Sequence, residues 1–177
     1  LVLQPNQQIL ETYQYERLVG FFDSDNEVAD TINYQQVNSV MAIGTGGLMG
    51  KGLNNNTTTS IKNGNYISEP QTDFIFAIVG EELGFVGSVI VIGLIGLIVF
   101  TCIMIGRRAK DMAGTLICVG MGSLVGFQSF VNIGVATGVL PNTGIPLPFI
   151  SYGLTSLVSM YIGIGFVLNV GLQPKKY

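Results

Sequence analysis

The sequence predicts an all-α membrane protein: a polytopic helical bundle in which three transmembrane helices follow a large extracytoplasmic loop region. Three observations predict this class. Only 11% of the 177 residues are charged, against about 25% in a typical soluble domain. Hydrophobic residues make up 48% of the chain. The second half contains three long uncharged segments, each close to the roughly 20 helical residues that cross a hydrocarbon core.

The predicted spans divide the chain into two regions. We expect the transmembrane helices at about residues 86–105, 112–134 and 155–172. They fill the region 86–177, while residues 1–85 are expected to form the extracytoplasmic loop region, with short helices and a candidate catalytic motif. An amphipathic helix is predicted at about residues 30–42, where apolar residues recur at helical spacing. In the second span, Gln128 and Asn132 indicate a face turned towards other helices.

Basic residues predict the orientation in the membrane. Five of them flank the spans: Arg107, Arg108 and Lys110 between the first two, and Lys175 and Lys176 after the third. The loop between the second and third spans contains neither Lys nor Arg. The positive-inside rule therefore places the C-terminus in the cytoplasm, and residues 1–72 and the loop at 138–153 outside.

The amino-acid composition excludes several kinds of catalytic and binding site. Histidine is absent, which excludes a histidine general base and most zinc sites. The formal net charge of −3 argues against nucleic acid as a partner. Cys102 and Cys118 both fall inside apolar segments, so we expect small buried side chains rather than a disulfide or metal pair.

A glycine-rich stretch at residues 44–52 invites comparison with a phosphate-binding P-loop. The match fails, because the required first glycine falls on Thr45 and the residue after Lys51 is Gly52 rather than Ser or Thr. Two interpretations stay open. The amides and Lys51 help to bind an anionic head group, or the glycines serve turn geometry alone.

The segment 69–84 contains the candidate catalytic group. Asp73 precedes six apolar residues, and Glu81 and Glu82 then interrupt them before the first span. A carboxylate at the mouth of a membrane helix loses part of its hydration, which makes it a stronger base. The alternative is that Asp73 caps a helix over residues 74–79 and that the two glutamates are solvated interfacial charges. The residues alone leave both open.

The loop at 138–153 is uncharged and contains three prolines. Pro146 and Pro148 lack amide donors and would interrupt a helix. Irregular backbone is not tolerated where it faces lipid. We therefore expect this loop to pack against protein or to lie at a cavity or the membrane surface.

These motifs together resemble the RodA/FtsW/SpoVE (SEDS) family of membrane glycosyltransferases that polymerise peptidoglycan. The likeness covers about residues 13–172, and the stretches that carry it are Thr-Asp-Phe-Ile-Phe-Ala at 72–77, Gly-Glu-Glu-Leu-Gly at 80–84, the glycine-rich segment, and the loop ending in Ser-Tyr-Gly at 151–153. The Lys51 form of the glycine-rich segment is closer to RodA than to FtsW.

The resemblance implies an inverting polymerisation of lipid II at the outer face of the bacterial cytoplasmic membrane. It implies Asp73 as the catalytic base. Residues expected to shape the substrate site are Lys51, Glu69, Thr72, Glu81, Ser151 and Tyr152. It leaves room for a divalent cation, Mg²⁺ or Mn²⁺, at the diphosphate, while no metal-binding residues are predicted. The implied partners are membrane lipids and a class B penicillin-binding protein, a transpeptidase.

The sequence also departs from the family pattern. Ser68, Pro70 and Gln71 replace the usual residues around Glu69, and Leu154 stands where a second glycine is usual. The family fold has ten membrane helices, and the chain resembles the part after the seventh, so we expect it to lack polymerase activity by itself. Two other functions stay open: a translocator of lipid-linked precursors and a noncatalytic scaffold of the cell-wall machinery.

Overall fold

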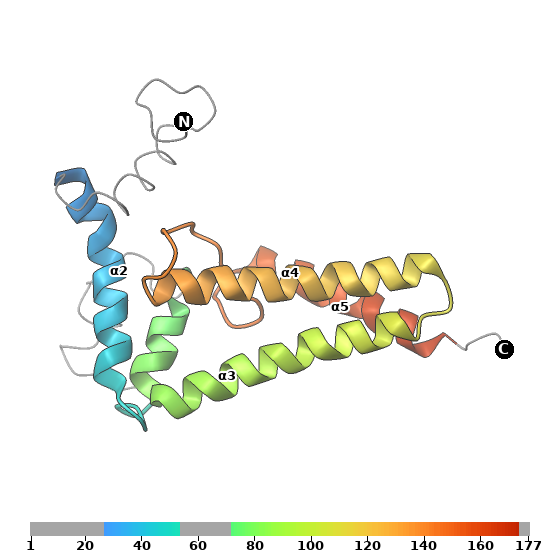
Figure 1. The fold of residues 1–177 in the computed structure, drawn as a ribbon, viewed down its shortest axis with the longest axis horizontal. Coiled ribbons are helices and arrows are strands. Elements are labelled where there is room, and N and C mark those ends of the chain that lie inside the picture. Colours follow the sequence, from blue (N-terminus) through green and yellow to red (C-terminus); the bar gives the residue numbers. More distant parts are fainter. Residues whose placement is uncertain (1–26, 54–71, 174–177) are drawn as a thin grey trace, which may run out of the picture.

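The structure is a computed structural model that describes residues 27–53 and 72–173. All regular structure in these residues is helical: α2 (Glu27–Gly46), α3 (Ile75–Arg107), α4 (Met112–Ala136) and α5 (Leu154–Leu172). α3 and α4 run antiparallel along the long axis, α5 packs against both, and α2 crosses one end of the bundle (Figure 1). The predicted all-α membrane class is confirmed.

Among the residues that the structure describes, three helices are long and apolar enough to cross a membrane: α3 with 33 residues, α4 with 25 and α5 with 19. α4 and α5 coincide closely with the segments expected at 112–134 and 155–172. α3 begins at Ile75, well before the expected start at residue 86. Gly84, with φ 67° and ψ −164°, is non-helical and breaks α3 into a short first section and a long second one.

α2 extends the predicted helix at both ends, and its contact face combines polar residues with the buried Ala42. Gln36 and Ser39 are buried, whereas Val37 and Met41 are more than half exposed. The reason lies at the C-terminal end of α4, where the last carbonyls have no partner within the helix. Gln36 Nε2 donates to Val135 O at 2.8 Å, and Ser39 Oγ donates to Ala136 O at 2.8 Å. The polar face of α2 therefore satisfies the end of α4.

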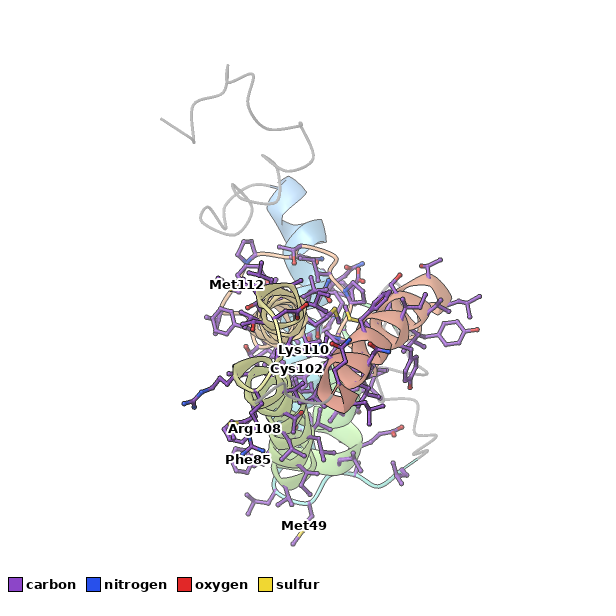
Figure 2. The ribbon with its side chains drawn as sticks, turned by 90° about the vertical axis from the view of Figure 1, so that its right-hand side faces the viewer. Met49, Phe85, Cys102, Arg108, Lys110 and Met112 are labelled. Atoms are coloured by element: carbon purple, nitrogen blue, oxygen red, sulfur yellow. The ribbon has the colours of Figure 1, made fainter. Side chains whose placement is uncertain are left out.

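The long sections of α3 and α4 approach each other closely because small residues face each other. Cys102 and Cys118 are free thiols and almost fully buried, which confirms the expectation for them. Cys102 lies against Gly122, and Cys118 lies against Gly106. Any larger residue at either glycine would meet a thiol-bearing carbon of the other helix. Seen along the bundle, Cys102 lies between the ribbons whereas Arg108 projects outwards (Figure 2).

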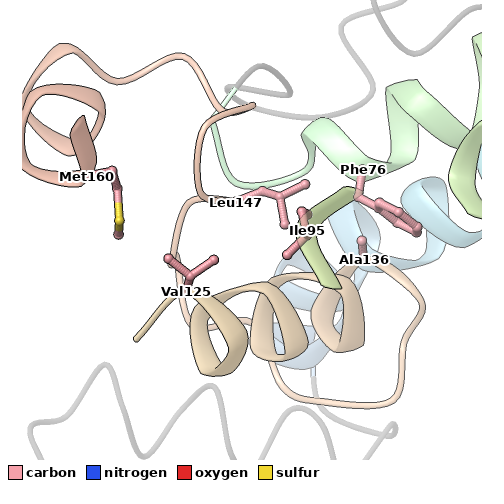
Figure 3. Packing of buried hydrophobic residues seen from close by; sticks show 6 residues of the cluster. All are labelled: Phe76, Ile95, Val125, Ala136, Leu147 and Met160. Atoms are coloured by element: carbon pink, nitrogen blue, oxygen red, sulfur yellow. The ribbon is translucent and has the colours of Figure 1, made fainter. Parts of the chain in front are cut away.

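The loop after α4 belongs to the core. Leu147 is 1% exposed and joins a cluster with residues of α3, α4 and α5: Phe76, Ile95, Val125, Ala136 and Met160 (Figure 3). Burial of an apolar side chain of this size stabilises a fold by roughly 1.5–3 kcal/mol. The expectation that the loop packs against protein is therefore confirmed.

Candidate active site

The candidate site lies at the end of the bundle where the start of α3 meets the loop after α4 (Figure 1). Thr72 and Asp73 are half-buried and immediately precede α3. The N-cap position of α3 is Phe74, with no side-chain capping hydrogen bond. The cap position therefore falls one residue later than the capping alternative placed it. Phe74 occupies the cap position because its ring is buried, at 1% exposed, among Ala42, Ala77 and Val135.

Ser151 ties the loop to the residue before the candidate base. Its hydroxyl donates to Thr72 O at 2.6 Å and accepts from the Leu147 amide at 2.7 Å. The side chain is 3% exposed, and both of these hydrogen bonds are to backbone groups. In the structure Ser151 holds protein backbone rather than facing open space, whereas the neighbouring Tyr152 is 77% exposed.

Asn132 on α4 holds the backbone of Asp73 in the same way as Ser151 holds that of Thr72. Its Nδ2 donates to Asp73 O at 2.8 Å and to Ile145 O at 2.7 Å. The residue is 1% exposed, and its Oδ1 has no hydrogen-bond partner among the described residues. Sequence reasoning assigned Asn132 an interhelical contact and missed its place in the site. The available signal was its position as a polar residue inside an apolar span.

Lys51 and Glu81 form a second polar group, one to two helical turns further along α3. Lys51 Nζ lies 2.9 Å from Glu81 Oε1, with side chains 26% and 3% exposed, respectively. The alternative in which Glu81 is a solvated interfacial charge is therefore wrong, because the residue is buried. The lysine stays beside the carboxylate because its backbone amide also donates to Glu81 O at 2.9 Å. Burying a carboxylate is costly unless an opposite charge and hydrogen bonds accompany it.

The glycine-rich stretch pairs with the break in α3. The amides of Phe85 and Val86 donate to the carbonyls of Gly47 and Leu48 at 2.9 and 3.2 Å, and Gly52 donates to Glu82 O at 3.1 Å. These bonds satisfy backbone groups that the break leaves without helical partners, as a membrane-embedded segment requires.

Glycine is needed on both sides of this contact. A Cβ at Gly46, Gly50 or Gly84 would overlap backbone atoms of the opposite segment, and Gly50 and Gly84 have positive φ. The amides of residues 50–52 already donate to protein carbonyls. The structure thus supports the turn-geometry interpretation of this stretch, and these three amides are not available to a phosphate.

The predicted site residues therefore fall into two groups. Thr72, Asp73 and Ser151 meet at the start of α3, and Lys51 and Glu81 meet near its break. Eight residues separate Asp73 from Glu81, which corresponds to about 12 Å along a helix axis. Glu69 lies outside the described residues. Within the described ranges, no group of three or more His, Cys, Asp or Glu side chains could hold a metal ion.

An apolar groove runs along α3 and α4 and reaches the glycine-rich stretch, and none of the site residues in the two groups lines it. It comprises a cavity of about 520 Å³ and a neighbouring one of about 350 Å³ next to Gly84, which share Ile92, Ile133 and Thr137. Its lining contains no charged residue. The groove itself therefore contributes no base, acid or cation from these lining residues.

Comparison with known proteins gives a consistent family. The family model described as cell cycle protein, covering FtsW, RodA and SpoVE, matches residues 3–176. Stage V sporulation protein E of Bacillus subtilis is 39% identical over 158 residues, covering 89% of this chain and 42% of that protein. The probable peptidoglycan glycosyltransferase FtsW of Halothiobacillus neapolitanus is 41% identical over 165 residues, covering 90% and 38%. The chain thus spans about two fifths of the length of these relatives.

Solved structures show the same similarity. A chain of a peptidoglycan synthase complex, described as coordinating polymerisation and crosslinking, superposes with a TM-score of 0.66 at 31% identity, covering 92% of this chain and 42% of that one. The rod-shape-determining protein RodA of Thermus thermophilus superposes with a TM-score of 0.55 at 24% identity, covering 98% and 62%. The second match supports the fold.

Proposed function

Because this chain belongs to the FtsW/RodA/SpoVE family of cell cycle proteins, we propose that the whole protein is a peptidoglycan glycosyltransferase that polymerises lipid II at the outer face of the bacterial cytoplasmic membrane. Curated relatives carry the name probable peptidoglycan glycosyltransferase. The observation that carries the proposal is the half-buried Asp73 at the mouth of α3, with its backbone held by two buried side chains.

Asp73 is the proposed general base. The acceptor hydroxyl attacks the anomeric carbon of the donor sugar while the bond from that carbon to the diphosphate oxygen breaks. The hydroxyl proton passes to the Asp73 carboxylate, and the configuration at the carbon inverts. Positioned bases of this kind contribute on the order of 10²–10⁴-fold to a rate. Glu69, Thr72 and Tyr152 are proposed to contact the substrate around this carboxylate.

The departing diphosphate needs positive charge. Lys51 is the proposed cation on this side of the membrane, and its ammonium, which lies 2.9 Å from Glu81 Oε1, has further N–H donors for a phosphate. A divalent cation, Mg²⁺ or Mn²⁺, would supply the same charge neutralisation. The described residues offer no cluster of three or more acidic or thiol ligands for it.

The proposed partner is a class B penicillin-binding protein, which would crosslink the strands that this protein polymerises. A solved relative is part of a peptidoglycan synthase complex, and that supports a partner for this protein as well. The closer likeness to RodA than to FtsW, taken from the Lys51 form, remains a prediction.

Multiple-turnover synthesis tests the function directly. The whole protein, purified in detergent with lipid II and no transpeptidase, is expected to convert lipid II into glycan strands. A translocator or a scaffold forms no glycosidic bond, so it yields no polymer in the same assay. Strands that appear in proportion to protein and time support the polymerase. Lipid II recovered unchanged, from protein that still binds it, would favour translocation.

We also propose the orientation that the positive-inside rule gives, with the turn at residues 107–110 in the cytoplasm and the C-terminal end of α2 outside. Single cysteines at Met49 and Arg108, both exposed, test it in a background in which Cys102 and Cys118 are alanine. A membrane-impermeant maleimide is expected to label position 49 in intact cells and position 108 only after permeabilisation. The reverse pattern would invert the topology and move Asp73 to the wrong face.

A further inference from the structure

We infer that Asn132 and Ser151 are positioning residues for Asp73, a buried brace that sets the direction in which its carboxylate projects; this inference rests on the proposed function. The two side chains come from different parts of the chain, α4 and the loop before α5. They donate to two consecutive carbonyls, Thr72 O at 2.6 Å and Asp73 O at 2.8 Å.

These two carbonyls have a special relation to the candidate base. The carbonyl of Thr72 belongs to the peptide plane before the α-carbon of Asp73, and the carbonyl of Asp73 belongs to the plane after it. Each peptide unit is rigid, so the backbone around one residue has only two soft dihedral angles, φ and ψ. Anchoring both planes fixes both angles, and with them the direction of the bond from Cα to Cβ. The brace therefore orients the side chain without touching it.

Both anchors are themselves held. The Ser151 hydroxyl accepts from the Leu147 amide at 2.7 Å, and the second Asn132 donor bond goes to Ile145 O at 2.7 Å. The loop and the start of α3 thus share the same two side chains, each at most 3% exposed. Because both donors are buried, loss of one leaves its half-buried carbonyl without the protein partner that holds it.

The brace acts on a residue outside the helix, because Asp73 precedes Phe74, the N-cap of α3. Displacement of a catalytic group by about 1 Å can lower a rate by about 10²-fold. Anchoring the backbone on both sides of Asp73 therefore helps to keep its carboxylate in one position.

Kinetics of the whole protein test the role. Asn132→Leu and Ser151→Ala are expected to lower kcat for lipid II polymerisation by up to about 10²-fold and to leave KM unchanged, because neither side chain is proposed to touch substrate. Ser151→Thr keeps the hydroxyl and should recover most of the rate. The matched controls are Gln128→Leu, one turn away on α4, and Ser129→Ala, whose buried hydroxyl donates to Val125 O within the helix at 2.7 Å.

Two results would overturn the brace. One is a fall in kcat no larger than in the two controls, at equal amounts of folded protein. The other is a higher KM at unchanged kcat, which would make Ser151 or Asn132 a substrate contact. If the unsubstituted whole protein makes no glycan, the proposed function is refuted. The brace is then tested by a second measurement.

That second measurement needs no catalysis. In an Asp73→Cys variant with Cys102 and Cys118 replaced by alanine, maleimide labelling reports how residue 73 is held. Adding Ser151→Ala is expected to change the labelling rate at position 73, whereas adding Ser129→Ala is not. Equal labelling rates in both would refute the brace independently of activity.

Discussion

Asp73→Asn in the whole protein is expected to lower the rate of lipid II polymerisation by about 10²–10⁴-fold, the usual contribution of a general base. Asparagine has nearly the same shape but cannot accept the hydroxyl proton. The contacts of residues 72 and 73 with Ser151 and Asn132 use backbone carbonyls, so they survive the substitution. The measurement is initial rate of glycan synthesis at saturating lipid II, with membrane insertion compared by the amount of extracted protein.

Asp111→Asn is the matched control for this experiment. Asp111 is the N-cap of α4, and its Oδ1 accepts from the Gly114 amide at 3.0 Å. Asparagine caps helices about as well as aspartate, so this variant should keep the parent rate. A polymer yield close to the parent's from Asp73→Asn would remove the base role from Asp73.

The sequence predicted α4 and α5 well, because a single physical requirement determines them. An apolar segment of this length in a hydrocarbon core can form few structures other than a helix. The sequence was less informative at α3, because Glu81 and Glu82 interrupt the apolar run and placed the expected start of the span at residue 86, whereas the helix begins at Ile75. The break at Gly84 depends on a distant segment, the glycine-rich stretch, which supplies its backbone partners.

Long-range contacts also limited what the sequence could predict about the candidate site. Asp73 was recognisable from its local sequence, as a carboxylate before an apolar run. Its contacts with Asn132 and Ser151 were not, because these residues are 59 and 79 positions away from their partners along the chain. Burial of Glu81 likewise depends on Lys51, 30 residues earlier. Polar contacts at such separations follow from tertiary packing, which a single sequence does not specify.

The Lys51–Glu81 pair leads to a prediction about stability that depends on the unequal exposure of its partners. Lys51 is 26% exposed and Glu81 is 3% exposed. Without Glu81, the lysine ammonium can turn to water through its exposed side. Without Lys51, the carboxylate stays buried and loses the ammonium beside it. Removing one partner of a buried pair costs about 3–5 kcal/mol when the remaining charge cannot escape, so the two single substitutions should differ.

We therefore expect Lys51→Met to destabilise the protein by about 3–5 kcal/mol, clearly more than Glu81→Gln, and the double variant Lys51→Met/Glu81→Leu to recover much of the loss. The readout is the thermal midpoint of aggregation of the whole protein in detergent. Lys110→Met is the control, because Lys110 is exposed in the turn between α3 and α4 and surface changes usually stay within about 0.5 kcal/mol. A midpoint for Lys51→Met equal to that of Lys110→Met, or a double variant that loses the sum of both single effects, would mean that the pair does not hold the glycine-rich stretch on α3.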